Sequence, residues 1–134
     1  MTWRVLVIDD EPAVRHALER SLRYFGYAVV SAAGGDSAYE ILQHDRFDIV
    51  LLDIRMPFMS GDTLFLAITR RWPELRERVI LMTGDAEYVM EGWSAELKNR
   101  PLLAKPFTLD TLTRCLASVL ESQSRQGRKF GNGA

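Results

Sequence analysis

Short apolar stretches alternate with longer amphipathic stretches through the first 121 residues of this 134-residue chain. The apolar stretches have the composition of strands and occupy residues 4–8, 27–32, 48–52, 78–82 and 101–104. The amphipathic stretches have helical spacing and lie near residues 12–25, 35–45, 61–72, 86–97 and 108–121. Strands that alternate with helices form a parallel sheet covered on both faces, so the sequence predicts a doubly wound α/β fold.

The ends of the predicted helices carry residues that helix ends favour. Pro12 lies in the first turn of the first predicted helix, and Gly26 follows its last turn. Thr108 and Asp110 open the last predicted helix. Because proline is tolerated in a first turn and glycine suits the residue that ends a helix, these positions support the predicted boundaries.

The charge balance argues against a nucleic-acid-binding role. Lysine and arginine together number 17, aspartate and glutamate number 18, and the net charge is -1. A protein that binds the phosphates of a nucleic acid usually carries a clear excess of positive charge. We therefore expect no direct nucleic acid binding by this domain.

The cysteine content and the length of the apolar runs indicate a cytoplasmic protein that does not enter a membrane. Cys115 is the only cysteine, which excludes an intrachain disulfide and fits a reducing compartment. Its place in an apolar helical pattern predicts a core residue rather than a reactive thiol. The N-terminus lacks the features of a signal peptide, and no run reaches the roughly 18 apolar residues of a membrane span.

The composition changes near residue 121. Residues 122–134 are polar and glycine-rich, with a small excess of positive charge. Segments of this kind are usually flexible and solvated. The sequence therefore predicts a single domain over residues 1–121, followed by a flexible polar tail or the stub of a linker over residues 122–134.

Charged residues follow three of the predicted strands. Asp9 and Asp10 follow the first strand, Asp53 follows the third, and Lys105 follows the fifth. The carboxyl ends of parallel strands share one edge of the sheet, so these side chains are expected to meet in one pocket. Clustered carboxylates repel one another unless a cation is present, which predicts bound Mg2+. A carboxylate can attack phosphorus and an ammonium can neutralise phosphoryl oxygens, so the pocket is typical of a phosphoryl acceptor.

A hydroxyl is expected at the same edge. Thr83 and Gly84 follow the fourth predicted strand, where a phosphoryl oxygen could accept hydrogen bonds from the hydroxyl and the backbone amides. Simpler interpretations remain open for single residues. Asp9 or Asp10 could only cap the following helix, and Thr83 could be an ordinary turn residue.

Taken together, these motifs resemble the receiver domain of two-component response regulators, across roughly residues 3–121. The segments that carry the resemblance are Asp9-Asp10, Leu51 to Gly61, Thr83-Gly84 and Lys105-Pro106-Phe107, in that order. The resemblance implies a flavodoxin-like sheet with the strand order 2-1-3-4-5. It also implies phosphorylation by a phosphohistidine on a sensor histidine kinase or a histidine phosphotransfer protein.

The resemblance implies a role for each residue of the pocket. Asp53 would be the phosphoacceptor, while Thr83 and Lys105 would hold the phosphoryl oxygens. Asp10, Asp53 and the main-chain carbonyl of Arg55 would bind Mg2+, with Asp9 assisting, and the Lys105–Pro106 bond would be cis. The domain would catalyse only its own phosphorylation and dephosphorylation. Its state would be read by a downstream protein, a linked output domain or a second copy in a homodimer.

Two positions bear on how such a domain would work. The family commonly has an aromatic residue where this chain has Leu102, so a readout through movement of a ring is not expected. Arg55 and Asp85 occupy positions that, in this family, tune the attack of water on the phosphoaspartate. A charged pair there could screen the phosphoryl group, so we expect an altered lifetime of the phosphorylated state.

Two other functions are compatible with parts of the pattern. The first is a Mg2+-dependent phosphatase that acts through an aspartyl-phosphate, but such enzymes often carry an acid two residues after the nucleophile, where this chain has Arg55. The second is a binding module with the receiver fold that works without phosphorylation. The presence of every main pocket residue makes the phosphoacceptor interpretation preferable to both.

Overall fold

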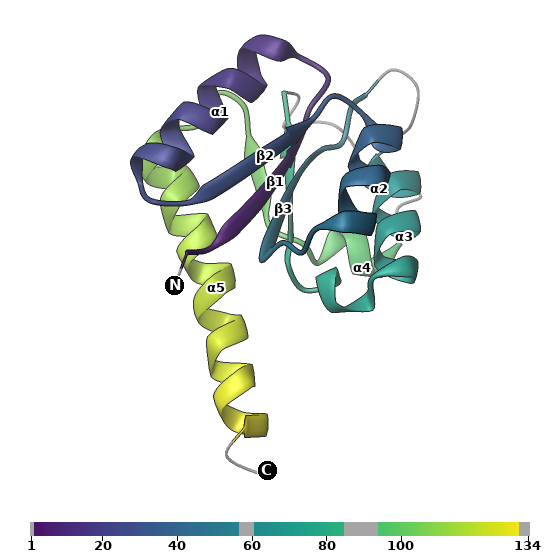
Figure 1. The fold of residues 1–134 in the computed structure, drawn as a ribbon, viewed down its shortest axis with the longest axis vertical. Coiled ribbons are helices and arrows are strands. Elements are labelled where there is room, and N and C mark those ends of the chain that lie inside the picture. The colour runs from purple at the N-terminus through teal and green to yellow at the C-terminus, as the bar shows by residue number, and fades with distance from the viewer. Residues whose placement is uncertain (1, 57–60, 85–93, 132–134) are drawn as a thin grey trace.

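The computed structural model describes residues 2–56, 61–84 and 94–131, which form a five-stranded sheet with helices on both faces (Figure 1). All neighbouring strands are parallel, and their order is β2-β1-β3-β4-β5. The strands are β1 (Arg4–Ile8), β2 (Ala28–Ala32), β3 (Ile49–Asp53), β4 (Val79–Thr83) and β5 (Leu102–Ala104). This confirms the doubly wound α/β fold and the strand order that the resemblance implied.

Each face of the sheet packs against its own set of helices. On one face lie α1 (Pro12–Tyr24) and α5 (Leu109–Gly131), and their apolar residues share a buried cluster with the strands. On the other face lie α2 (Gly35–His44), α3 (Gly61–Arg71) and α4 (Ala95–Lys98), which form a second buried cluster (Figure 1). The sheet therefore lies between two apolar cores, as a doubly wound fold requires.

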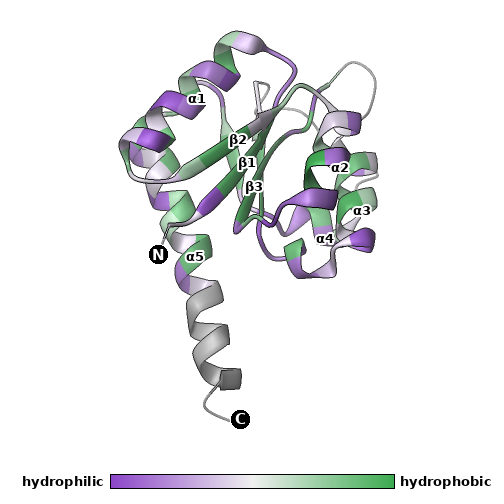
Figure 2. Cartoon of the chain, viewed as in Figure 1, coloured by the Kyte–Doolittle hydropathy of each residue, from purple (hydrophilic) through white to green (hydrophobic). Residues whose placement is uncertain are grey.

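Alternation along the strands supplies both cores. Val5 and Val7 of β1 pack on the side of α1 and α5, whereas Leu6 and Ile8 pack on the side of α2 and α3. All five residues of β3 are buried, and Figure 2 shows hydrophobic colour along the central strands. Because successive side chains point to opposite faces, a strand buried on both faces must be apolar throughout. The one charged residue of β3, Asp53, stands at its end.

The described elements lie close to the predicted ranges, apart from the third, fourth and fifth predicted helices. The third predicted helix ends at Arg71, and a single turn of 3-10 helix, η1 (Pro73–Leu75), follows it. Pro73 has no backbone N–H to donate, which ends the α-helix. The predicted helix over residues 86–97 falls largely outside the described residues, of which only Ala95–Lys98 form α4.

The last helix continues beyond the predicted domain boundary. Helix α5 ends at Gly131, whereas the sequence predicted a flexible tail from residue 122 (Figure 1). Val119 and Leu120 are the last residues of α5 that belong to the core, among the side chains that the structure describes. No proline interrupts residues 121–131, so the backbone hydrogen bonds of the helix can continue past the core. The division into a domain and a tail at residue 121 stays a prediction.

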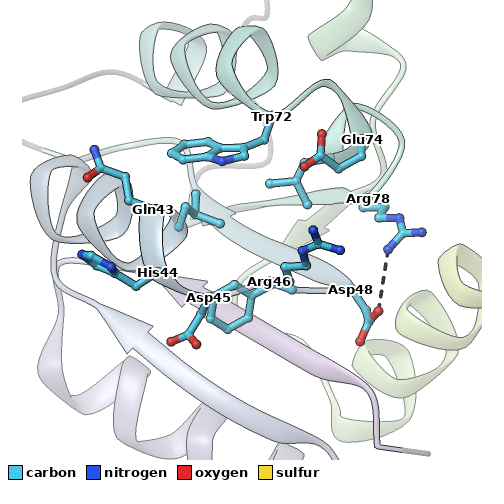
Figure 3. Close-up of a pocket in the computed structure, with 11 residues that line it drawn as sticks. Gln43, His44, Asp45, Arg46, Asp48, Trp72, Glu74 and Arg78 are labelled. Carbon is cyan, nitrogen blue, oxygen red and sulfur yellow. Dashed lines mark ion pairs between the residues drawn. The ribbon is translucent and has the colours of Figure 1, made fainter.

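Polar contacts tie the amino ends of the strands together. Asp48, just before β3, accepts a hydrogen bond from the backbone N of Arg4 at 2.7 Å. Its other carboxylate oxygen lies 3.6 Å from the Arg78 guanidinium, and Figure 3 shows this ion pair in the pocket that Trp72 and Glu74 also line. These residues border a hollow of about 710 Å³. Asp48 thus links the starts of β1, β3 and β4, at the edge opposite the acidic residues.

A close backbone approach fixes the start of α3 against the end of β3. A Cβ atom added to Gly61 would lie 2.6 Å from the Cα of Ile54, a distance that no side chain tolerates. The Gly61 N–H also donates to the Ile54 carbonyl at 3.2 Å. Glycine is therefore required where α3 meets the strand that ends in Asp53.

Two further sequence predictions concern the core and the membrane. Cys115 is half-buried against the cluster on the α1 and α5 side, which agrees with a core residue, and burial raises the pKa of its thiol. In the part of the chain that the structure describes, no helix combines the length and apolarity needed to cross a membrane.

Candidate functional site

The carboxyl edge of the sheet brings together the residues predicted from the sequence. Asp9 follows β1, Asp53 is the last residue of β3, and Thr83 is the last residue of β4. Lys105 follows β5. Because β1, β3 and β4 are neighbours in the sheet, their ends lie side by side and their side chains converge.

Three carboxylates form the centre of the site. One oxygen from each of Asp9, Asp10 and Asp53 lies within 4.8 Å of the other two. Asp9 is fully buried, Asp53 is 3% exposed, and Asp10 is half-buried. Three hard oxygen donors at this spacing fit a divalent cation such as Mg2+, which prefers carboxylate and carbonyl oxygens and keeps several waters.

Lys105 joins two of these carboxylates. Its Nζ donates to Asp9 Oδ2 at 2.7 Å and to Asp53 Oδ2 at 3.3 Å. The Lys105–Pro106 peptide bond is cis, as the resemblance implied, and the Lys105 N–H donates to the Thr83 carbonyl. Burial alone would lower the pKa of Lys105, but the hydrogen bonds and charges of the two aspartates outweigh it and raise that pKa. The ammonium is therefore firmly held in its charged form.

The Asp53 carboxylate has one partner for each oxygen. The backbone N–H of Arg55 donates to Oδ1 at 3.0 Å, and Lys105 donates to Oδ2. Burial raises the pKa of Asp53 and the charge of Asp9 adds to this, whereas Arg55 and Lys105 oppose it, and the net shift is upward. The buried negative charge is thus only partly offset by the protein, which favours the binding of a further cation.

Asp9 and Asp10 differ in their surroundings. Both carboxylate oxygens of Asp9 accept hydrogen bonds, one from the Glu11 N–H at 2.9 Å and one from Lys105. In the described part of the chain, the Asp10 carboxylate accepts no hydrogen bond and forms no ion pair, so it is the more available ligand. The helix-cap interpretation of Asp9 is not supported, because Glu11 is the N-cap residue of α1 and α1 has no side-chain cap.

The remaining predicted residues lie around this centre. Thr83 is 1% exposed and follows Met82, which pairs with Asp53 in the sheet register. The side chain of Arg55 is exposed, while Asp85 lies outside the described residues. The effect of these two residues on the lifetime of a phosphorylated state stays a prediction. Leu102 is 39% exposed on β5.

Sequence reasoning missed a groove beside the site. Its walls come from α1 and from the segment after β5, and its volume is about 570 Å³. The residues that line it include Val14, Ala17, Leu18, Pro106, Phe107 and Leu112, with Gly84 and Lys105 also on its border. The signal in the sequence was the spacing of Ala13 and Ala17, two small residues one turn apart in an amphipathic helix, and the structure shows both exposed.

Comparison with known proteins supports the resemblance. Residues 5–117 match the family model of the response regulator receiver domain. The chain is 33% identical over 126 residues to sporulation initiation phosphotransferase F of Bacillus subtilis (strain 168), which covers 92% of this chain and 98% of that protein. It is 32% identical over 120 residues to response regulator MprA of Mycolicibacterium vanbaalenii, which covers 90% of this chain and 51% of that protein.

Solved structures show the same similarity. The structure of response regulator protein TrrA from Thermotoga maritima, in complex with Mg(2+)-BeF, matches with a TM-score of 0.76 and 28% identity. The match covers 89% of this chain and 100% of that chain. The chain thus spans nearly the whole of some relatives and about half of others.

Proposed function

This chain belongs to the response regulator receiver domain family, and on that premise we propose that Asp53 accepts a phosphoryl group from a phosphohistidine. The donor would be a sensor histidine kinase or a histidine phosphotransfer protein. The observation that carries the proposal is the buried Asp53 carboxylate, held by Lys105 at 3.3 Å within a cluster of acids. A buried carboxylate with an adjacent ammonium and further acids that can hold a cation is suited to phosphoryl transfer.

The residues would act as follows. A carboxylate oxygen of Asp53 attacks phosphorus, an O–P bond forms, and the N–P bond of the phosphohistidine breaks with its electron pair left on the imidazole. Lys105 offsets the negative charge of the phosphoryl oxygens. The Thr83 hydroxyl donates to one of these oxygens. Attack of water on the phosphorus of the aspartyl phosphate would break the Asp53 O–P bond, release inorganic phosphate and return the Asp53 carboxylate, so the domain would act only on itself.

Mg2+ would complete the site. Asp10, Asp53 and the main-chain carbonyl of Arg55 would hold it, with Asp9 assisting. When bound, it would supply positive charge that offsets the charge of the phosphoryl group. Asp9 would also hold Lys105, whose Nζ lies 2.7 Å from its Oδ2.

Incubation with acetyl phosphate tests the proposal. With Mg2+, intact mass spectrometry is expected to show the addition of one phosphoryl group. With a chelator in place of Mg2+, the modified fraction is expected to fall at least about tenfold, because the buried acids then lack their cation. A chain that binds Mg2+ but is never modified would contradict the proposal and favour a binding module that works without phosphorylation.

We further propose that the phosphodonor docks in the apolar groove beside the site. A donor histidine must come within reach of Asp53, so its protein must contact the surface next to Lys105. The groove of α1 and the segment after β5 borders Lys105 and is mainly apolar, and Ala13 and Ala17 leave room on its α1 side. An amphipathic helix laid into such a groove is a common mode of recognition.

Ala17→Arg is expected to slow phosphorylation by a protein donor but not by a small donor. The donor in this test is the histidine kinase that phosphorylates the parent chain fastest. The arginine would fill the groove, so the rate of phosphotransfer from this kinase is expected to fall at least about tenfold, which corresponds to about 1.4 kcal/mol. Phosphorylation by acetyl phosphate is expected to stay unchanged, since that donor needs no groove. Ala67→Arg, at an exposed position of α3 on the other face of the sheet, is the control. Equal kinase rates for the two variants would argue against docking in this groove.

Phosphorylation would then change what the domain binds. A downstream protein, a linked output domain or a second copy of this chain would recognise the phosphorylated form, in the cytoplasm where such donors act. Exposed Leu102 on the edge strand β5 would contribute to that surface without the movement of an aromatic ring.

A further inference from the structure

An arginine of α1 contacts the loop that carries the acidic pair. The guanidinium Nη1 of Arg15 donates to the main-chain carbonyl of Asp9 at 2.7 Å, and the side chain is half-buried. Arg15 also follows Glu11, whose carbonyl accepts the Arg15 N–H in the first turn of α1. The Arg15 side chain therefore links the start of α1 to the end of β1, beside the hydrogen bond from the Glu11 N–H to the Asp9 carboxylate.

The contact completes the set of bonds that hold Asp9. Its N–H donates to the Ala32 carbonyl at 3.1 Å, which ties it to the end of β2. Its carboxylate accepts from Glu11 and Lys105, and its carbonyl accepts from Arg15. Each backbone and side-chain polar group of Asp9 thus has a partner, so this residue is fixed in orientation.

Fixing the Asp9 carbonyl has a direct consequence for Asp10. The carbonyl of one residue and the N–H of the next belong to the same planar peptide unit. A bond that holds the Asp9 carbonyl therefore sets the plane from which the Asp10 Cα and its carboxylate extend. The Asp9 and Asp53 carboxylates are held by hydrogen bonds of their own, so the placement of the Asp10 carboxylate depends on this peptide plane more than theirs does.

We propose that Arg15 is a positioning residue that aims the Asp10 carboxylate at the cation site. This inference rests on the proposed Mg2+ site. Arg15 would act through the peptide plane rather than by touching the cation or the phosphoryl group. Partners that orient metal ligands in this way commonly change metal affinity by about 10-fold to 100-fold when they are removed.

The positive charge of Arg15 and its positioning contact would change Mg2+ affinity in opposite directions when Arg15 is removed. A guanidinium bound to the Asp9 carbonyl repels a Mg2+ ion that approaches the acidic cluster, so its removal would tighten Mg2+ binding if charge alone mattered. Loss of a positioning contact would instead weaken Mg2+ binding. The two explanations predict opposite changes in one measured quantity.

Calorimetric titration with Mg2+ distinguishes them, using the parent chain and the variants Arg15→Met, Arg15→Lys and Arg20→Ala. Methionine keeps the apolar stem of the side chain but has neither donor nor charge, so the Mg2+ dissociation constant is expected to rise about tenfold. Lysine keeps both a donor and a charge, and its dissociation constant is expected to stay within about threefold of the parent value. Arg20, exposed on the same helix, is the control for loss of a cation, and its variant is expected to bind as the parent does.

Thermal unfolding without Mg2+ shows whether the variants are folded. Unchanged or tighter Mg2+ binding by Arg15→Met would overturn the inference, and so would equal losses in the methionine and lysine variants. Failure of the parent chain itself to bind Mg2+ would instead refute the proposed metal site, and this inference with it. Normal binding by the parent with no change in Arg15→Met would leave the metal site standing and remove the role of Arg15.

Discussion

Asp53→Asn is expected to abolish phosphorylation by acetyl phosphate, whereas Asp48→Asn is expected to leave it unchanged. Asp48 directly precedes the central strand β3 and Asp53 ends it. Each carboxylate forms an ion pair, Asp48 with Arg78 and Asp53 with Lys105. Of the two, only Asp53 lies beside Asp9, Asp10 and Lys105. An amide oxygen is a far weaker nucleophile than a carboxylate oxygen, so the substitution removes the acceptor while keeping the shape of the side chain.

Intact mass after incubation with acetyl phosphate and Mg2+ is the measurement. The parent chain and Asp48→Asn should gain one phosphoryl group, and Asp53→Asn should gain none. Thermal unfolding of all three gives the control for folding, and Asp48→Asn is expected to unfold at a lower temperature because its links to Arg4 and Arg78 weaken. Full modification of Asp53→Asn would place the acceptor elsewhere, with Asp10 as the first position to test by peptide mapping.

Asp53→Asn is also expected to change the stability of the chain in a way that depends on pH. The pKa of Asp53 is raised by burial, so the folded state binds its proton more tightly than the unfolded state does. In the pH window between the unfolded pKa and the higher folded pKa, stability falls as the pH rises. At neutral pH, ionised Asp53 therefore lowers stability, and Asp53→Asn should unfold at a temperature at or above that of the parent.

The carboxyl edge of the sheet was predictable because a simple rule connects strands to sites. Once residues 4–8, 48–52 and 78–82 were assigned to parallel strands, Asp9, Asp53 and Thr83 had to lie at one edge. The rule needs only the direction of the strands and a boundary within one or two residues. The structure places Asp53 and Thr83 inside the ends of β3 and β4 and keeps them buried there.

Contacts between side chains were beyond the reach of the same reasoning. The sequence placed Lys105 near the acids, but it could not show that Lys105 lies closer to Asp9 than to Asp53. The bond from Arg15 to the Asp9 carbonyl depends on how α1 packs against β1, which periodicity does not define. The continuation of α5 to Gly131 was missed because polar and glycine-rich composition usually indicates a flexible segment.

Lys105→Met is expected to lower both the stability and the phosphoryl acceptance of the chain, and added Mg2+ is expected to restore only the stability. Without Mg2+ at neutral pH, the buried Asp9 and Asp53 carboxylates lose the hydrogen bonds from the Lys105 ammonium, and the free energy of unfolding should fall by about 2 kcal/mol. A change of that size corresponds to a fall of roughly 8 °C in the midpoint of thermal unfolding. Lys98→Met, at an exposed position of α4, is the matched control and is expected to stay within about 0.5 kcal/mol of the parent.

The pH dependence of this loss follows from the carboxylates that remain. The lysine lowers the pKa of Asp53, so its removal raises that pKa further and widens the window in which the folded state binds the extra proton. Within that window stability falls as the pH rises, so the deficit of Lys105→Met should be smallest near pH 4 and largest at neutral pH.

Mg2+ supplies the missing positive charge and should recover much of the stability. Acceptance of phosphoryl groups should remain impaired, because a cation held by Asp10 and Asp53 does not replace the ammonium on the phosphoryl oxygens. A stability deficit that neither acid nor Mg2+ reduces would mean that Lys105 matters for packing rather than for charge.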